Sequence, residues 1–296
     1  MNAWKAAYPF TGRRIDLGGY AMHYLDEGKG ETVVFVHGNP TWSFYFREAI
    51  KHLRSSHRCL APDHVGMGLS DRPGDRAYRY TLESRIADLE TLITRVAPTG
   101  PVSLVLHDWG GMIGMGWAVR HPERVARVAA FNTSCFRLPP GKRFPAGLAF
   151  LRGPLGALAI RGLGAGRRAV LRTCTARRVL APEVAAGYLE PLDGWREARA
   201  AHRFVQDIPL SPRDRSWAVV ADIEARLGAL KDKPVLLPWG LKDWVFDEDF
   251  LAGWVERFPK AVVKRFPDCG HLLLEDAPER VVPLLADFLA GKTVAA

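Results

Sequence analysis

The sequence predicts an α/β fold, a mostly parallel, doubly wound sheet with an inserted helical cap. Short apolar, β-branched runs such as Thr32–Val36 alternate with segments of helical periodicity over most of the chain. The alternation stops over residues 136–215, a stretch rich in Gly, Ala, Pro and Arg, and resumes with a strand at Pro234–Trp239. We therefore expect an α/β core domain of residues 1–135 and 216–296, interrupted by a helical cap subdomain of residues 136–215.

The first part of the chain supplies a sheet edge and two core strands. Gly18-Gly19 separates two strand-like runs, Arg14–Leu17 and Tyr20–Tyr24, a pattern typical of a hairpin. Thr32–Val36 (TVVFV) is continuously apolar, as expected for a strand buried on both faces. A short strand is expected at Arg58–Ala61, and helices at Trp42–Leu53 and Tyr80–Val96.

Val102–Gly111 (VSLVLHDWGG) is the most informative segment of the chain. Its apolar run ends on Asp108, and Gly110 and Gly111 follow, which predicts a strand, a sharp turn and a helix that ends before His121-Pro122. This geometry places Asp108 at the carboxyl end of the sheet, where such folds carry their nucleophile. An aspartate there attacks saturated or strained carbon and becomes an ester. A helix-capping Asp at a buried strand end is the simpler alternative.

The remaining elements complete the sheet. Strands are expected at Val125–Phe131, Pro234–Trp239 and Ala261–Phe266, and an amphipathic helix at Pro278–Leu289. Because parallel strands end at a common edge, the loops that follow them meet in the crevice where ligands bind.

Composition narrows the class of protein. A chain of 296 residues that is 48% hydrophobic can bury a large core. The amino-terminal segment has no apolar run typical of a signal peptide. The longest apolar region, Phe144–Ile160, is interrupted by Arg152 and falls short of the ~20 residues of a membrane span. We expect a soluble, cytoplasmic protein.

The four cysteines stand far apart, so neither a zinc site nor a disulfide framework is suggested, and no metal or other cofactor is expected. The net charge is +9, yet no basic stripe with interleaved aromatics indicates nucleic-acid binding. Residues 141–215 hold 14 Lys/Arg against 6 Asp/Glu. This basic cap could simply face water, or face an acidic partner protein or an anionic membrane surface. The oligomeric state stays open.

Three residues have the chain order of a nucleophile, an acid and a histidine: Asp108, Asp243 and His271. His271 follows the last strand by a short loop and can act as a base towards water, although loop histidines are more often merely solvated. Asp243 follows a strand and can orient the imidazole, or can serve as a turn residue. No Asp or Glu occurs between Glu123 and Glu183, so the competing position for the acid, after the strand at Val125–Phe131, lacks one.

Several motifs together resemble the haloalkane dehalogenases, which have the α/β-hydrolase fold. They are His37–Trp42 (HGNPTW), His107–Gly111 (HDWGG), Asp243 after its strand, and Cys269–His271. The resemblance runs nearly end to end. It implies that Asp108 is the nucleophile, His271 the base, Asp243 the acid, and Asn39 and Trp109 the donors to the leaving halide. Neutral N–H donors suit these roles, because they can solvate a developing anion without neutralising a carboxylate nucleophile.

The position of the acid matches the subgroup with an Asp-His-Asp triad and an Asn-Trp halide pair. This subgroup also contains the β-lactone decarboxylases of bacterial long-chain olefin biosynthesis, and similarity to them is strongest at Ala7–Phe10, Ala21–Gly28, Pro62–Asp71 and Gln206–Pro212. The resemblance implies a small apolar substrate. Haloalkane hydrolysis through an alkyl-enzyme ester is the first function expected. Decarboxylation of a cis-3,4-dialkyl-oxetan-2-one is the alternative, and a homo-oligomer or an assembly with olefin-pathway enzymes through the basic cap accords with it.

Other classes fit less well. Epoxide hydrolases use two cap tyrosines, and residues 136–215 contain only Tyr188. Fluoroacetate dehalogenases have an arginine after the nucleophile, where this chain has Trp109. A non-catalytic binding protein on the same fold would need no intact triad.

Two further observations concern the details of the site. Leu106, two residues before Asp108, departs from the small residue that general hydrolases of this fold prefer there. Phe136, Phe204 and Phe246 are the expected walls of the substrate pocket.

Overall fold

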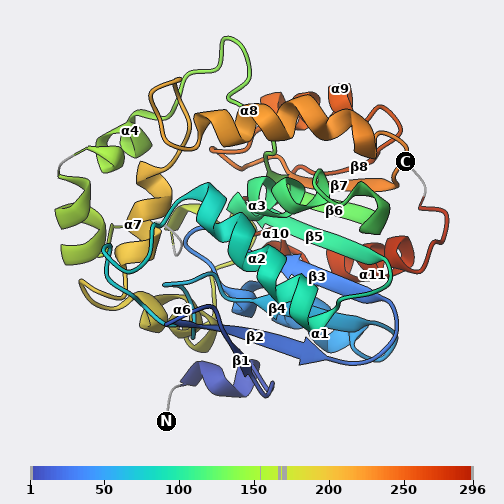
Figure 1. Cartoon of the computed structure of the whole chain (residues 1–296), viewed down its shortest axis with the longest axis horizontal. Coiled ribbons are helices and arrows are strands. Elements are labelled where there is room, and N and C mark those ends of the chain that lie inside the picture. Colours follow the sequence, from blue (N-terminus) through green and yellow to red (C-terminus); the bar gives the residue numbers. More distant parts are fainter. Residues whose placement is uncertain (1–2, 154, 166–167, 169–171, 295–296) are drawn as a thin grey trace.

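An eight-stranded sheet in the order β1-β2-β4-β3-β5-β6-β7-β8 forms the centre of the molecule (Figure 1). The computed structural model describes residues 3–153, 155–165, 168 and 172–294. β2 pairs antiparallel with β1 and with β4, and the pairs from β4 to β8 are parallel. The mostly parallel sheet with a hairpin at one edge is therefore confirmed.

The strands are β1 (Arg13–Asp16), β2 (Ala21–Glu27), β3 (Thr32–Val36), β4 (Arg58–Pro62), β5 (Val102–Asp108), β6 (Val125–Thr133), β7 (Val235–Gly240) and β8 (Val262–Phe266). The α-helices are α1 (Arg47–Leu53), α2 (Leu82–Val96), α3 (Trp109–Ala118), α4 (Ala146–Arg152), α6 (Pro182–Leu189), α7 (Arg199–Gln206), α8 (Trp217–Arg226), α9 (Glu248–Arg257), α10 (Leu273–Asp276) and α11 (Pro278–Leu289). Shorter helical turns are η1 (Ala3–Ala7), η2 (Ser43–Phe46), η3 (Pro122–Arg124), η4 (Leu158–Gly162), η5 (Glu190–Leu192) and η6 (Leu227–Leu230).

The predicted and observed elements differ mainly at their ends. The helix expected over Trp42–Leu53 consists of a 3₁₀ turn followed by α1. α2 begins at Leu82 because Thr81 caps it, its side chain accepting a hydrogen bond from the Ser84 N–H. α9, between β7 and β8, is an element that the sequence did not predict.

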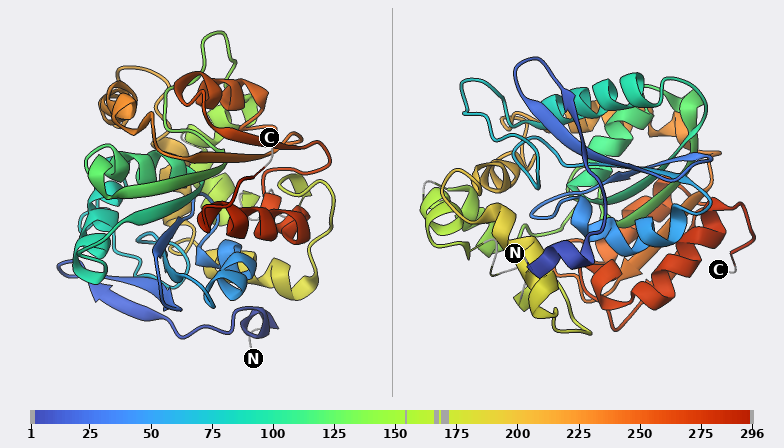
Figure 2. Two further views of the ribbon diagram at one scale, coloured as in Figure 1. Left: turned by 90° about the vertical axis from the view of Figure 1, so that its right-hand side faces the viewer. Right: turned by 90° about the horizontal axis from the view of Figure 1, so that it is seen from below.

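Alternate residues of each central strand enter two separate hydrophobic cores. In β3, Val34 and Val36 pack into one core, whereas Val33 and Phe35 pack into the other. The first core also holds residues of α2, α3, α8 and α9, and the second holds residues of α1, α10 and α11. The sheet is thus covered by helices on both faces (Figure 2), which places its functional loops at the carboxyl ends of the strands.

The long insertion between β6 and β7 contains α4, η4, α6, η5 and α7, most of which lie at the left of Figure 1. α4 and η4 both pack against α7. Of the predicted cap, residues 154, 166–167 and 169–171 lie outside the described residues, as do residues 1–2 and 295–296 of the predicted core. Among the described residues, no helix is long and apolar enough to cross a membrane.

Candidate active site

Asp108 occupies a sharp turn between β5 and α3, as the sequence predicted. Its φ of 52° lies in the left-handed region, which is uncommon for a residue with a side chain. Gly110 and Gly111 allow the chain to pack closely around this turn, because they have no side chain. A Cβ on Gly110 would lie 1.9 Å from the Val36 carbonyl oxygen, and one on Gly111 would lie 2.0 Å from Thr133 Oγ1. The carboxylate of Asp108 is held where a strained strand-to-helix turn presents a nucleophile.

The departure at Leu106 is accommodated by a glycine on the following helix. A Cβ on Gly114 would lie 2.3 Å from Cδ2 of Leu106, so the space that the leucine side chain fills exists because Gly114 has none. Leu106 is fully buried in the core beneath the turn. The large residue two places before Asp108 is therefore compatible with the turn.

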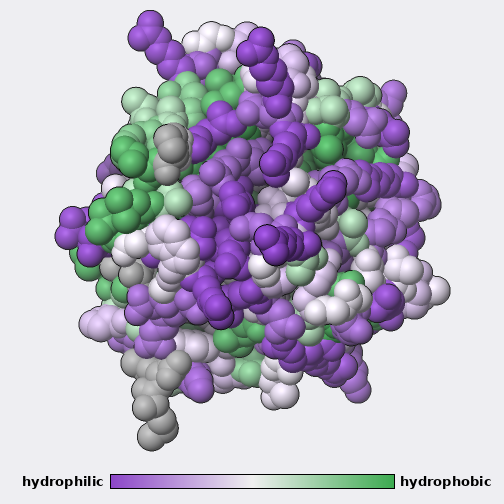
Figure 3. All heavy atoms as spheres, turned by 60° about the vertical axis from the view of Figure 1, so that its left-hand side comes forward, coloured by the Kyte–Doolittle hydropathy of each residue, from purple (hydrophilic) through white to green (hydrophobic). Residues whose placement is uncertain are grey.

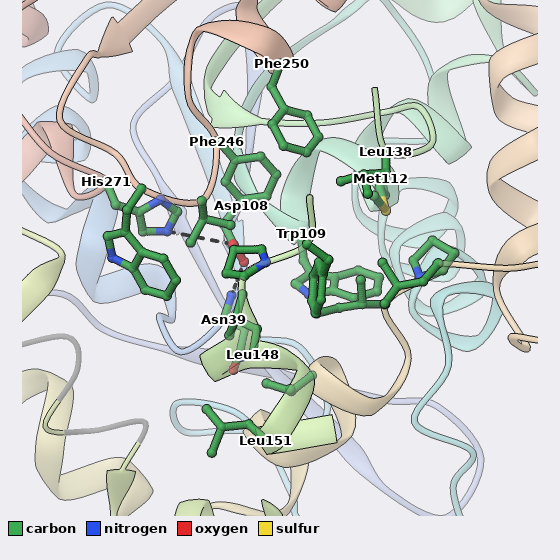
Figure 4. A pocket seen from close by; sticks show the side chains of 18 of the residues that line it. Asn39, Asp108, Trp109, Met112, Leu138, Leu148, Leu151, Phe246, Phe250 and His271 are labelled. Atoms are coloured by element: carbon green, nitrogen blue, oxygen red, sulfur yellow. Dashed lines mark hydrogen bonds and ion pairs between the residues drawn. The ribbon is translucent and has the colours of Figure 1, made fainter. Parts of the chain in front are cut away.

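Asp108, His271 and Asp243 lie in one line of contacts, of which Figure 4 shows the pair of Asp108 and His271. His271 Nε2 is 3.7 Å from Oδ2 of Asp108, and His271 Nδ1 donates to Oδ2 of Asp243 over 2.7 Å. The other oxygen of Asp243 accepts hydrogen bonds from the backbone N–H groups of Val245 and Phe246. This fixes the Asp243 carboxylate, which in turn orients the imidazole with Nε2 towards Asp108.

The position near the end of β6, where the acid could have stood instead of Asp243, is occupied by an asparagine. Asn132, near the end of β6, donates from its amide to the Gly240 carbonyl and accepts from the Gly240 N–H over 2.8 Å. Its side chain therefore ties β6 to the end of β7 and makes no hydrogen bond to His271. The structure brings Asp243, not a residue after β6, to the histidine.

The two oxygens of Asp108 have different partners. Oδ1 accepts a hydrogen bond of 2.5 Å from the Asn39 backbone N–H, and the Trp109 N–H also bonds the carboxylate, while Oδ2 faces His271. Burial raises the pKa of Asp108 to about 6, against the opposing effect of His271 and the two backbone N–H groups. The Asn39 N–H therefore holds Oδ1, whereas Oδ2 points towards His271.

The pKa values of His271 and of the neighbouring His107 are shifted in opposite directions. Burial opposes protonation of His271, but Asp243 and Asp108 outweigh it and raise the pKa of His271 above its ordinary value. Burial holds the pKa of His107 well below its ordinary value, with His271 adding to the effect. The neutral His107 donates from Nε2 to the carbonyl of His271 over 2.9 Å and so supports the loop that carries the histidine.

Asp276 is a further buried carboxylate beside the site, and no motif in the sequence predicted it. It accepts hydrogen bonds from the Gly270 N–H at 2.7 Å and from the N–H groups of Ala176, Arg177 and Arg178 at 2.9 to 3.2 Å. One side chain thus joins the backbone before His271 to the segment at 176–178. Four backbone donors satisfy a charge that would otherwise be costly to bury.

Above Asp108 opens a cavity with mostly apolar walls (Figure 4). Asn39, Asp108, Trp109 and His271 form its polar end. Its apolar walls include Met112, Phe136, Leu138, Leu148, Leu151, Phe246 and Phe250. A site of this kind binds an apolar molecule and directs one reactive end of it to the carboxylate.

Two of the three phenylalanines expected as pocket walls, Phe136 and Phe246, line the cavity, and Phe204 does not. α7 presents Ala201 and Val205 to the cavity, whereas Phe204 lies behind Trp109, with their ring centroids 5.4 Å apart. Phe204 also stacks on the guanidinium of Arg85, so this ring supports Trp109 from outside the cavity.

Tyr188 likewise lies away from the cavity. Its hydroxyl donates to Oε1 of Glu275 over 2.5 Å, and Glu275 also pairs with the buried Arg47. Among the described residues that line the cavity, none is a tyrosine. The described residues also hold no group of His, Cys, Asp and Glu that could bind a metal ion.

Comparison with known proteins agrees with this geometry. Residues 31–278 match the model of the alpha/beta hydrolase fold family. The chain is 44% identical to a cis-3-alkyl-4-alkyloxetan-2-one decarboxylase of Shewanella oneidensis, covering 95% of this chain and 89% of that protein. It is 43% identical to the protein of the same name in Xanthomonas campestris pv. campestris, covering 95% and 97%.

More distant relatives are named dehalogenases. Haloalkane dehalogenase 2 of Mycobacterium bovis is 30% identical, with 95% of both chains covered. Among solved structures, haloalkane dehalogenase DbeA from Bradyrhizobium elkani superposes with a TM-score of 0.84 at 24% identity, covering 95% of this chain and 98% of that one, and so shows the shared fold. This chain belongs to the α/β-hydrolase fold family, within the group that contains the haloalkane dehalogenases and the cis-3-alkyl-4-alkyloxetan-2-one decarboxylases.

Proposed function

We propose that this chain decarboxylates cis-3-alkyl-4-alkyloxetan-2-ones, and that the same site hydrolyses haloalkanes as a second activity. The observation that carries the proposal is Asp108, the one carboxylate among the described residues that line the apolar cavity, with Oδ1 held by the Asn39 backbone N–H and Oδ2 facing His271. The higher identity of the decarboxylases over nearly the whole chain favours the lactone as the main substrate. Haloalkane hydrolysis, the first expectation from the sequence, is supported by the more distant relatives.

Decarboxylation needs a nucleophile and no water. Oδ2 of Asp108 attacks C4 of the lactone in line with the ring C4–O bond, which breaks and leaves a carboxylate on C3. The electron pair of the C3–CO₂ bond then forms the C3=C4 double bond. Carbon dioxide departs, the ester bond from C4 to Oδ2 breaks, and the Asp108 carboxylate is restored. Inversion at C4 followed by anti elimination yields a cis alkene from a cis lactone.

The proposed roles of Asn39 and Trp109 follow from their position at the polar end of the cavity. Their side-chain N–H groups stabilise the ring oxygen as it gains charge, or a halide as it leaves. Both donors are neutral, so they leave the charge of the Asp108 carboxylate intact.

Haloalkane hydrolysis uses the same first step and then a different second one. Asp108 displaces the halide, and the resulting alkyl ester is attacked by water. His271, oriented by Asp243, accepts the proton of that water. The backbone N–H groups of Asn39 and Trp109, which already bond the Asp108 carboxylate, stabilise the negative charge on the tetrahedral intermediate.

We further propose that residues 136–215 act as the cap over this site, because Phe136, Leu148, Leu151 and Val205 from that segment line the cavity. A cytoplasmic location accords with four free cysteines, all of them buried. A homo-oligomer, or an assembly with other enzymes of olefin biosynthesis, stays a prediction.

The test supplies the purified protein with a long-chain cis-β-lactone and, in parallel, with 1,2-dibromoethane and 1-bromobutane. We expect one alkene and one carbon dioxide per lactone, with slower halide release from the bromoalkanes. Asp108→Ala should abolish both activities while the protein remains folded by circular dichroism. Efficient halide release with an untouched lactone would reverse the order of the two substrates, and an active Asp108→Ala variant would refute the site.

A further inference from the structure

The outer surface of the cap carries a cluster of exposed hydrophobic side chains. We call Phe150, Leu155, Leu158, Leu163 and Trp195 the cap patch; their exposed fractions lie between 50% and 60%. Leu158 and Trp195 of the patch meet at Gly162, since a Cβ there would lie 3.1 Å from Leu158 Cδ1 and 3.7 Å from the Trp195 ring. Figure 3, in which the cap side of the molecule comes forward, shows hydrophobic side chains gathered beside hydrophilic ones. Such clusters on a folded chain mark interaction surfaces.

Unpaired positive charges accompany the cap patch. Exposed arginines flank it in the chain, Arg143 before α4 and Arg168 and Arg172 after Leu163. Among the described residues, no carboxylate lies within ion-pair distance of these three arginines. By contrast, Arg178 and Arg203 have their charges paired with Glu279 and Asp75. These arginines therefore add positive charge to the chain segments before and after the patch.

A further arginine, Arg161, lies directly against the tryptophan of the patch. The guanidinium of Arg161 lies 4.2 Å from the ring centroid of Trp195, and its Nε donates to the Trp195 carbonyl. A partly exposed tryptophan with an adjacent arginine is typical of residues at the boundary between water and lipid.

The cap patch is also the outer side of the wall that closes the catalytic cavity. Leu148 and Leu151 of α4 and Ile160 of η4 line the cavity, whereas Phe150 and Leu158 of the same two helices are exposed. One layer of short helices thus separates the cavity from the patch. A substrate with two alkyl chains dissolves in a bilayer rather than in water, because each buried CH₂ favours the apolar phase.

We propose that the cap patch docks on an anionic phospholipid bilayer, so that the substrate passes from lipid through the cap into the cavity. This rests on the proposed function insofar as the substrate is an apolar lactone. Exposed hydrophobic side chains enter the boundary of the acyl chains, and the arginines contact anionic headgroups. An acidic protein or a second copy of this chain would match the charge or the apolar surface, but an anionic bilayer matches both and supplies the substrate.

The experiment uses flotation of the full chain with phosphatidylcholine vesicles, with or without phosphatidylglycerol. We expect binding to the anionic vesicles, weakened by salt because the charges are exposed. Two variants test the two components: Leu158→Ser with Leu163→Ser, and Arg168→Glu with Arg172→Glu. The arginine variant should lower the affinity for anionic vesicles at least tenfold, given about fivefold per arginine near an anionic surface. The leucine variant should also lower the affinity at least tenfold, because two aliphatic side chains no longer enter the apolar phase.

A matched control reverses the charge of two exposed lysines that precede β3 and β7, Lys29→Glu with Lys231→Glu. This control should float like the parent chain. All variants should turn over a water-soluble, short-chain β-lactone at the parent rate, since none of the changed residues lines the cavity. Thermal unfolding checks that each variant is folded.

The outcomes separate this proposal from the proposed function. A parent chain that turns over the short-chain lactone but fails to float overturns the docking surface alone. A chain that floats as expected but processes no lactone overturns the function and leaves the surface. If the patch variants instead convert a sedimenting dimer to a monomer and leave flotation unchanged, the patch is an interface between two copies and the lipid proposal is wrong.

Discussion

Replacement of His271 by glutamine is expected to separate the two reactions of the site. Hydrolysis of the alkyl ester needs a base for water, and the base is worth about 10² to 10⁴ in rate, or about 3 to 5 kcal/mol. Decarboxylation involves no proton transfer in the steps proposed above. The variant should therefore lose haloalkane turnover by that factor and retain lactone turnover within about tenfold.

In the proposed mechanism, neither His107 nor Asp243 is placed to replace His271 as the base. His107 is fully buried, its Nε2–H is engaged by the carbonyl of His271, and its pKa lies well below the ordinary value because of burial. Oδ1 of Asp243 accepts hydrogen bonds from two backbone N–H groups, and Oδ2 is the oxygen that bonds the imidazole of His271 in the parent chain. The full factor should consequently be observed.

The assay follows both products under matched conditions. With 1-bromobutane, rapid quenching should show a burst of one halide per active site, and mass spectrometry should show the protein carrying one butyl group. With the lactone, alkene should form over many turnovers. Because His271 also lowers the pKa of Asp108, the measurements belong at a pH well above 6. His52→Gln, an exposed histidine on α1, is the control. A lactone rate that falls as far as the hydrolytic rate would refute the proposed division of labour.

Three further predictions follow from the geometry. Burial raises the pKa of Asp108 to about 6, and only the carboxylate attacks, so lactone turnover should fall as the pH is lowered through about 6. Haloalkane turnover also needs neutral His271, whose pKa is raised above its ordinary value, so it should already fall at a higher pH. Rate profiles with both substrates test this, and superimposable profiles would contradict it. Gly114→Val should lower the free energy of unfolding by about 1 to 3 kcal/mol through overpacking against Leu106. In urea denaturation, Leu106→Ala in the same chain should restore part of that loss, and strictly additive effects would exclude the contact. Asp276→Asn should reduce kcat and leave KM nearly unchanged, because the change loosens the backbone before His271 and Asp276 does not line the cavity. Steady-state kinetics with the bromoalkane test this prediction. A change confined to KM would argue against a positioning role.

The sheet and the line from Asp108 to Asp243 could be predicted because their signals are local. Buried parallel strands show as continuous apolar runs, and a strand that ends on Asp followed by glycines predicts the turn from adjacent residues alone. The prediction for Asp243 depended on the absence of any acid near Asn132, and the structure shows Asn132 bonded to the backbone of Gly240.

Features that depend on contacts between distant segments could not be predicted. Gly114 is recognised as the partner of Leu106 only when α3 packs on β5. Asp276 meets residues 100 positions away in the chain, and its sequence neighbourhood resembles that of any helical acid. Phe204 was expected in the cavity because it is aromatic, but the orientation of α7 turns it behind Trp109.

The contrast between the two ends of the cavity has a consequence for how such a chain changes over time. The charged end is built from strand ends and tight turns, where even a Cβ on Gly110 or Gly111 would collide with the neighbouring chain, so we expect a substitution there to disturb the reaction itself. The opposite end is built from interchangeable aliphatic side chains of α4 and α7, which make no hydrogen bonds to the charged groups. Substrate length and shape can therefore be altered by exchanging leucines and valines in the insertion, while the chemistry stays as it is. A family with this division can diversify its substrates through a segment that carries none of its reactive atoms.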